Sequence, residues 1–197
     1  MKAAVPSAVR KAARPAAAPA GAPTAAKPPA PGTIKGRLQV RQSGVHGKGV
    51  FALVPIWKGE LILEYTGEVI TWPEALRRHP HDPSQPDHTF YFHLNDELVI
   101  DGNVGGNASK WINHSCAPNV EADDESGQVY LLALRNIKPG EELFFDYGLV
   151  IEERYTPALK KRFECRCGAK HCRGTMLAPK RGSAPKATQR ASGAAKA

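Results

Sequence analysis

The sequence predicts a mostly-β single domain that lies between two basic tails and ends in a small cysteine-bearing appendage. The middle of the chain consists of short apolar runs separated by turn signals, and helix-like periodicity is scarce. At both ends the composition changes abruptly to Ala, Pro, Gly, Ser and Lys. We therefore expect a tail at 1–33, a folded domain at 34–150, the appendage at 151–177 and a second tail at 178–197.

Five apolar runs are expected to form strands because residues that favour turns flank them. The runs span residues 61–65, 90–94, 98–102, 129–134 and 142–145. Pro73 suits the first turn of a short helix that ends before Pro80. A second short helix is expected at 107–112, and three prolines and three histidines mark 79–88 as a loop.

The net charge of +8 is concentrated in the tails, each of which holds five basic residues and no acidic one. This leaves 17 basic and 19 acidic residues in 34–177, so the folded part is mildly acidic. Without hydrophobic periodicity the tails cannot offset the entropy of ordering, and we expect both to be disordered. They are interpreted either as solvated linkers or as basic arms that make weak, salt-sensitive contact with nucleic acid.

No apolar run is long enough to span a membrane, and the N-terminus lacks the contiguous apolar segment of a secretory signal. A transit peptide stays open as an interpretation of the N-terminal tail, although the second, similar tail favours a pair of basic arms. We expect no membrane association, a monomer, and an intracellular, reducing location in a cytoplasm, nucleoid or nucleus. Export to a host cell is not excluded.

All four cysteines lie between the two tails, in a pattern that suits a metal better than a disulfide. Three of them share one short segment, and Cys165 and Cys167 are too close in sequence to bridge each other easily. Together with Cys116 they predict a tetrahedral, all-cysteine zinc site, and ordinary buried thiols are the alternative. Four thiolates leave no open coordination position, so such a zinc would be structural.

Five motifs follow one another in the order found in a known enzyme family. They span residues 46–52, 64–68, 111–119, 141–148 and 165–172. With them the chain resembles the SET-domain protein-lysine N-methyltransferases that carry a post-SET zinc-binding loop. The resemblance covers roughly residues 37–177. It implies a SET-domain fold of short β-sheets with a C-terminal pseudoknot and a small four-cysteine zinc post-SET loop.

The resemblance also implies S-adenosylmethionine as the cofactor, structural Zn²⁺, and a lysine-rich protein substrate. The family often has Arg-Phe where this chain has Lys110 and Trp111. The cofactor-binding residues it implies are His46, Gly47, Lys48, Gly49, Tyr91, Asn113 and His114. The zinc ligands it implies are Cys116, Cys165, Cys167 and Cys172.

The catalytic roles implied by the resemblance fall on aromatic residues. Tyr147 would orient the lysine amine and stabilise charge beside the methyl group, and Tyr65 would be the second tyrosine of the substrate channel. Phe145 occupies the position of a Phe/Tyr switch, and Phe there predicts that higher methylation is accessible. Taken alone, these residues have structural interpretations: a hairpin turn at 47–49, a capped turn at 113–114, and core packing for the tyrosines.

The leading functional prediction is methyl transfer to lysine side chains of a basic protein, either histone-like or another protein such as a ribosomal one. The alternative is a non-catalytic SET-like module that binds nucleic acid or chromatin-like partners through its basic tails. An acidic run at 121–125 is either a substrate-facing patch or a solvated turn. The tails contain lysines, so they are themselves candidate substrates.

Overall fold

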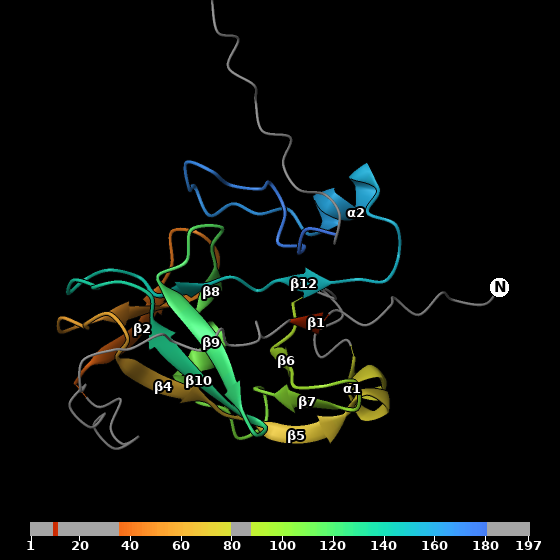
Figure 1. Ribbon diagram of the computed structural model, residues 1–197, viewed down its shortest axis with the longest axis horizontal. Coiled ribbons are helices and arrows are strands. Elements are labelled where there is room, and N and C mark those ends of the chain that lie inside the picture. The colour runs from red at the N-terminus through yellow and green to blue at the C-terminus, as the bar shows by residue number, and fades with distance from the viewer. Residues whose placement is uncertain (1–9, 12–35, 80–87, 181–197) are drawn as a thin grey trace, which may run out of the picture.

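The computed structural model describes residues 10–11, 36–79 and 88–180, and almost all of its elements are short strands (Figure 1). The strands are β1 (Arg10–Lys11), β2 (Leu38–Gln42), β3 (Lys48–Ala52), β4 (Leu61–Tyr65), β5 (Glu68–Thr71), β6 (Tyr91–His93), β7 (Leu98–Asp101), β8 (Asn113–His114), β9 (Val120–Glu125), β10 (Gln128–Ala133), β11 (Phe144–Phe145) and β12 (Leu149–Val150). The helices are α1 (Trp72–Arg78), the 3₁₀ helix η1 (Ala108–Trp111) and α2 (Pro157–Arg162). The mostly-β prediction is confirmed.

Within the described residues the strands form five small sheets. Two are three-stranded and antiparallel, in the orders β4-β10-β9 and β5-β7-β6. Strands β2 and β3 form an antiparallel pair, and β1 pairs antiparallel with β12. Strands β8 and β11 are parallel, which places Asn113 beside Phe144 and His114 beside Phe145. That last pairing brings the motifs at 111–119 and 141–148 side by side.

Local signals explain where the helices begin and end. The Thr71 side chain accepts a hydrogen bond from the N–H of Glu74 at the start of α1, and a proline occupies the first turn. The helix ends at Arg78, and the extended backbone of the C-cap residue His79 suits the residue before a proline. The second predicted helix is a single 3₁₀ turn instead, because Asn107 caps it and Ile112 is already extended.

The interpretation of the acidic run at 121–125 as a solvated turn is wrong, because the run forms most of strand β9. The turn follows it, at Ser126 and Gly127, which both have positive φ angles, as a tight β-hairpin requires. The run at 142–145 forms a strand only in its last two residues. The sequence did not predict strands β1, β2, β3, β5, β8, β9 and β12 or helix α2.

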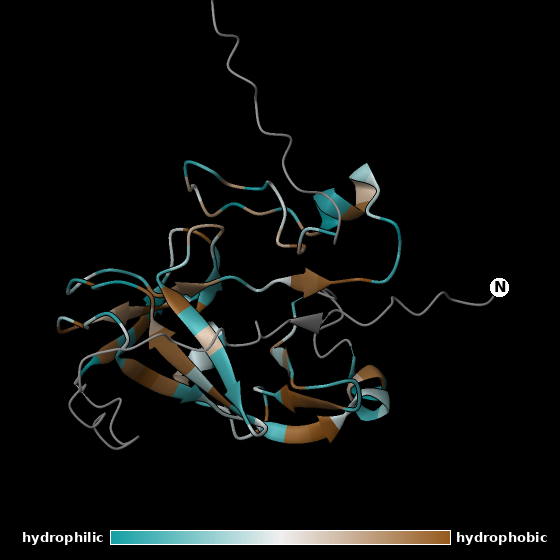
Figure 2. Ribbon diagram, viewed as in Figure 1, coloured by the Kyte–Doolittle hydropathy of each residue, from teal (hydrophilic) through white to brown (hydrophobic). Residues whose placement is uncertain are grey.

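The main core lies between the β4-β10-β9 sheet and the segments that carry β3, β6, β8 and β11. Its largest fully buried side chains include Tyr65, Phe92, Phe145 and Leu131. A second cluster lies between α1 and its sheet, and a third joins β12 to the C-terminal appendage. The brown segments of β4, β7, β10 and β12 mark these apolar clusters in Figure 2. Tyr147 packs against both the main core and the third cluster, so it sits where the appendage meets the domain.

The two predicted tails lie mostly outside the described residues, and their disorder stays a prediction. In the first tail the structure describes Arg10 and Lys11, which form β1. None of the helices in the described ranges is long and apolar enough to cross a membrane.

Candidate functional site

A cavity of about 730 Å³ opens between the β2–β3 loop, the segments around η1 and β8, and the C-terminal appendage. Seven of the residues that the sequence assigned to a site line it: His46, Gly47, Lys48, Asn113, His114, Tyr147 and Cys165. The sequence reading gave no site role to several other lining residues, among them Phe90, Trp111, Leu149 and Phe163. The predicted cofactor motifs, which are far apart in sequence, therefore converge on one cavity.

The glycine loop of this cavity is held in shape by Asn113. The Asn113 Nδ2 lies 3.2 Å from the carbonyl oxygen of His46 and 2.9 Å from that of Lys48. It also lies 3.0 Å from the Glu142 carboxylate, which accepts a further bond from the Ser43 hydroxyl at 3.0 Å. Asn113 and Glu142 thus fix the loop whose backbone forms one wall of the cavity.

Both glycines of the loop are required by its geometry. Gly47 has a φ of +48°, in the left-handed region that favours glycine. A side chain on Gly49 would collide with the Glu142 carboxylate. Gly47 lines the cavity, whereas Gly49 does not line it and instead lets the Glu142 carboxylate pack closely against the loop.

Two lysines and an aromatic ring form one end of the cavity. The ammonium of Lys48 lies 4.7 Å from the centre of the Trp111 ring, and that of Lys110 lies 5.2 Å from it. Phe90 packs edge-on against Trp111, with 5.0 Å between ring centres. This end of the cavity suits a ligand that combines an anionic group with a flat, apolar one.

A chain of aromatic rings runs from the cavity into the core. Ring centres are 4.9 Å apart for Tyr147 and Phe145, 6.3 Å for Phe145 and Phe92, and 5.2 Å for Phe92 and Tyr65. The sequence indicated no site role for Phe92, because an aromatic residue next to a site and one in the ordinary core look alike in an apolar strand. The chain joins the predicted catalytic tyrosines and Phe145 in one continuous row of rings, which we call the aromatic wall. Only Tyr147 lines the cavity, and the other three rings are buried in the main core.

The two tyrosine hydroxyls donate their protons to backbone carbonyls. Tyr147 donates to Ile112 at 2.9 Å, and Tyr65 donates to Phe90 at 2.8 Å. Burial raises the pKa of both tyrosines well above its ordinary value, so both stay protonated at neutral pH. A hydroxyl whose proton is committed in this way interacts with a further polar group through its lone pairs, which suits an N–H donor.

Tyr91 was predicted to bind the cofactor, but the structure places it away from the cavity. Its hydroxyl donates to the carbonyl of Ala75 at 3.2 Å, and its ring is buried in the cluster with Trp72 and Val99. It is not among the residues that line the cavity. Because side chains alternate along β6, the neighbouring Phe92 faces the main core instead.

The four cysteines gather into one cluster. Their sulfur atoms all lie within 4.8 Å of one another, with 3.7 Å between Cys116 and Cys165 and 3.9 Å between Cys116 and Cys172. A Zn–S bond of about 2.3 Å gives tetrahedral sulfur–sulfur distances of about 3.8 Å. The donor set and its spacing therefore fit Zn²⁺, which favours thiolates.

Backbone N–H groups point at three of these sulfurs. Arg173 donates to Cys116 at 3.3 Å, Gly174 donates to Cys172 at 3.4 Å, and Cys116 donates to Cys167 at 3.5 Å. Burial opposes ionisation of Cys167, but backbone N–H groups outweigh it and lower its pKa to about 6. Such donors stabilise the thiolate form that binds a metal.

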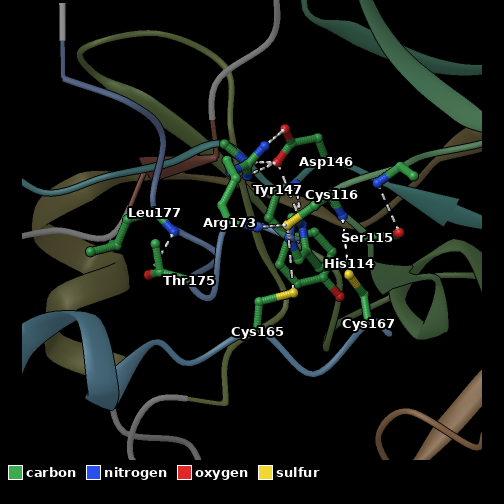
Figure 3. A network of polar contacts seen from close by, with 12 residues as sticks. His114, Ser115, Cys116, Asp146, Tyr147, Cys165, Cys167, Arg173, Thr175 and Leu177 are labelled. Carbon is green, nitrogen blue, oxygen red and sulfur yellow. Dashed lines mark hydrogen bonds and ion pairs between the residues drawn. The ribbon is translucent and has the colours of Figure 1, made fainter. Parts of the chain in front are cut away.

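His114 and Asp146 connect the cysteine cluster to Tyr147 (Figure 3). The His114 Nδ1 accepts the backbone N–H of Tyr147 at 3.1 Å, which leaves the ring proton on Nε2, 3.5 Å from the Cys116 sulfur. Asp146 forms a bidentate ion pair with Arg173 at 2.6 and 2.7 Å. Arg173 directly follows Cys172, so the pair ties the cysteine loop to the segment that carries Tyr147. The sequence reading had not identified this pair.

Comparison with known proteins bears on the part of the chain that holds the cofactor motifs. Residues 47–148, more than half of the chain, match the family described as SET domain. The chain is 36% identical over 145 residues to histone-lysine N-methyltransferase trithorax of Drosophila virilis, and 38% identical over 155 residues to histone-lysine N-methyltransferase SUV39H2 of Xenopus tropicalis. These alignments cover 72% and 69% of this chain but 4% and 38% of those proteins, so the chain spans only a part of the curated relatives it matches.

A solved structure supports the same fold. It is described as ctPRC2 in an autoinhibited conformation bound to S-adenosylmethionine, and it is 31% identical in sequence with a TM-score of 0.51. The match covers 57% of this chain and 15% of that chain.

Proposed function

This chain belongs to the SET-domain family, and from that premise we propose that it catalyses S-adenosylmethionine-dependent methyl transfer to lysine side chains of a basic protein. The observation that carries the proposal is the aromatic wall of Tyr147, Phe145, Phe92 and Tyr65, which begins at the cavity formed by the cofactor motifs. A ligand in the cavity and an amine beside the wall would meet at Tyr147.

The cavity residues fit the cofactor by their chemistry. Lys48 or Lys110 would pair with its carboxylate, and the Trp111 ring would pack against its flat base. The loop at His46 and Gly47, which Asn113 holds in shape, would approach it through backbone. When bound, S-adenosylmethionine would supply an electrophilic methyl group on a positively charged sulfur.

The protein's part in the reaction is to deliver a neutral amine in the right direction. A free lysine has a pKa of about 10.4, so its deprotonation at neutral pH costs roughly 4–5 kcal/mol. An apolar aromatic channel and a nearby sulfonium charge both lower that pKa. The lone pairs of the Tyr147 and Tyr65 hydroxyls would accept the amine N–H bonds, so that the nitrogen lone pair points at the methyl group.

Several further roles belong to the same proposal. Zn²⁺ held by the four cysteines would be structural, since four thiolates close its coordination shell. The substrate would be a lysine-rich protein, because the folded part is mildly acidic and the relatives are named histone-lysine N-methyltransferases. We place the enzyme in a reducing intracellular compartment, because its four cysteines form no disulfide and suit a thiolate metal site. We also propose that it acts as a monomer.

Incubation with methyl-labelled S-adenosylmethionine and a mixture of histones and other basic proteins tests the function. We expect label on protein, recovered after hydrolysis as methyllysine. If no protein is labelled while the chain binds nucleic acid tightly, the non-catalytic alternative replaces this proposal.

Replacing Gly49 with Ala is expected to weaken cofactor binding. The new methyl group would displace the Glu142 carboxylate, which Ser43 and Asn113 hold in place. Overpacking of this kind costs about 1–3 kcal/mol. If this cost falls on the binding conformation of the loop, the affinity drops by roughly 5- to 150-fold. Calorimetric titration with S-adenosylmethionine measures the change.

The matched control is Gly44→Ala in the same loop, where an added methyl group meets nothing within 4 Å. It should bind the cofactor like the wild type. Equal affinities for Gly49→Ala and the wild type would contradict the role given to this loop.

Phe145 should permit more than one methyl group per lysine. Its ring is buried between Tyr147 and Phe92, and a Tyr there would add a hydroxyl that occupies space and binds the amine or a water. We expect di- or trimethyl product from the wild type and mainly monomethyl product from Phe145→Tyr. Mass spectrometry of the labelled protein distinguishes these products.

Phe144→Tyr is the control, because adjacent residues of β11 face opposite sides and Phe144 is less buried. It should leave the product distribution unchanged. A wild type that yields only monomethyl lysine, with no change in Phe145→Tyr, would refute the assignment.

A further inference from the structure

An exposed tryptophan stands on one of two neighbouring loops that do not line the cavity. Residues 53–60 follow β3 and residues 134–141 follow β10, and both loops lie beside β2 in Figure 1. Trp57 is 64% exposed, more than any other large hydrophobic side chain that the structure describes. Tryptophan is highly buried on average, so this ring is a candidate contact for a ligand.

The two loops are joined through their backbones. Ile56 and Ile137 form an antiparallel bridge with hydrogen bonds of 3.0 and 2.8 Å, and both side chains are buried. Because neighbouring residues of an extended backbone face opposite sides, Trp57 and Lys138 are turned outward. The backbone N–H of Trp57 also donates to the Glu60 carboxylate at 2.8 Å. The Trp57 ring is therefore presented on a well-anchored backbone.

The surface around Trp57 is basic, although the domain that carries it is acidic. Residues 34–150 contain 10 basic and 16 acidic side chains. Residues 37–41 border the two loops, because Arg41 donates to the carbonyl of Gly140 at 3.3 Å and Leu53 donates to that of Arg37 at 2.8 Å. These three segments hold five basic residues and only two acidic ones: Arg37, Arg41, Lys58, Arg135, Lys138, Glu60 and Glu141. We call this surface, with Trp57, the Trp57 patch.

Both acidic residues of the Trp57 patch are matched by an arginine. Glu60 pairs with Arg37, and Glu141 pairs with Arg135 at 2.8 Å. The other three cations are exposed and form no ion pair with any residue that the structure describes: Arg41, Lys58 and Lys138. The patch thus offers a flat aromatic face together with three positive charges that have no anion.

We propose that the Trp57 patch binds single-stranded nucleic acid. A base stacks on the Trp57 ring, and neighbouring phosphates pair with Lys58, Lys138 and Arg41. An acidic peptide would use the charges and leave the ring without a partner of its own kind. A duplex fits poorly, because its bases are stacked on one another and cannot reach the ring. The patch lies outside the cavity, so this binding does not depend on the proposed methyl transfer.

Fluorescence anisotropy of the full-length chain with labelled oligonucleotides of about 12 nucleotides tests the proposal. Single-stranded DNA, single-stranded RNA and duplex DNA are compared, and the two single strands distinguish DNA from RNA as the ligand. We expect Trp57→Ala to weaken single-strand binding by roughly 5- to 150-fold, the loss of one stacked base. Trp57→Phe keeps a ring and should keep most of the affinity.

The charges of the patch are tested by the salt dependence. Each neutralised phosphate of a single strand contributes about 0.7 to the slope of log K against log salt, so Lys58→Gln with Lys138→Gln should reduce that slope by about 1.4. Lys160→Gln with Lys170→Gln is the matched control, because both lysines are exposed on the appendage. This control should bind with the wild-type slope.

A second readout does not depend on Trp57→Ala. Binding should quench tryptophan fluorescence in the wild type and leave it unchanged in Trp57→Phe, which retains Trp72 and Trp111. Equal affinity of the wild type and Trp57→Ala for both single strands, or no quenching in the wild type, would overturn the proposal and assign binding to other parts of the chain. Quenching by poly-glutamate and not by nucleic acid would also overturn it, in favour of an acidic protein partner.

Methyl transfer separates this proposal from the preceding one. Trp57→Ala should methylate the basic protein mixture like the wild type, since Trp57 does not line the cavity. If the wild type binds single strands through Trp57 and labels no protein, the proposed function is wrong and the Trp57 patch stands. If it labels protein and Trp57→Ala binds single strands as tightly as the wild type, the reverse holds.

Discussion

Tyr147→Phe is expected to lower kcat for methyl transfer by on the order of 10²–10³-fold, the usual effect of removing one preorganised hydrogen-bonding group from an active site. The hydroxyl lost belongs to a residue that lines the cavity, and it donates to the carbonyl of Ile112. Without it the amine loses the lone pair that would orient it. Steady-state kinetics with labelled cofactor measure the change.

The same variant should bind the cofactor almost normally. The ring remains, together with its contacts to Phe145 and His114, and the backbone N–H of residue 147 still donates to His114. The carbonyl of Ile112 loses a donor, which costs about 1–3 kcal/mol of stability. A thermal melt should therefore show a folded, somewhat destabilised protein with a large loss of rate.

Tyr130→Phe is the matched control, because Tyr130 is a half-buried residue of β10 that does not line the cavity. It removes the same atom and should leave kcat unchanged. If Tyr147→Phe kept the wild-type rate, the hydroxyl would have no catalytic role and the aromatic wall would be a structural feature alone.

Seven of the residues that line the cavity were predictable because five short motifs follow one another in the order of a known family. Taken alone, the glycine loop and the Asn113-His114 pair have structural interpretations, and their contacts join residues far apart in sequence. The strands at β4, β7 and β10 were predictable from local signals, since apolar runs between turn residues have few alternatives.

The parts that were not predictable depend on distant pairings. Strand β9 carries four acidic residues and takes its conformation from pairing with β10. Phe92 and Tyr91 are adjacent, and only the side of the sheet on which each lies decides that one joins the wall and the other packs under α1. The Arg173–Asp146 ion pair joins residues 27 positions apart, and neither carries a local signal of its partner.

Cys167→Ser is expected to remove the metal and, with it, nearly all methyl transfer. Serine is a poor ligand for Zn²⁺ in a thiolate site, and three remaining sulfurs leave the tetrahedron incomplete. The appendage supplies Phe163, Cys165 and Met176 to the cavity wall, so loosening it should also weaken cofactor binding. Elemental analysis of the purified protein and calorimetric titration measure the two effects.

His171→Ala is the control for a substitution in this loop that leaves the four cysteines in place. His171 is exposed and directly precedes Cys172, yet it lies outside the four-sulfur cluster. This variant should keep one zinc per chain and the wild-type rate. A chelator should inactivate the wild type reversibly, so that added Zn²⁺ restores transfer by the wild type and not by Cys167→Ser.

The two large losses should differ in kind. Tyr147→Phe removes a group at the reacting amine and should retain both zinc and cofactor. Cys167→Ser should lose the zinc and bind the cofactor weakly, so its loss of rate arises from the missing metal and cofactor. His114 and the Arg173–Asp146 pair connect the two regions, so loss of the metal is expected to disturb Tyr147 through them. An active Cys167→Ser protein without zinc would show that these contacts hold the appendage in place without a metal. The four cysteines would then not be a structural metal site.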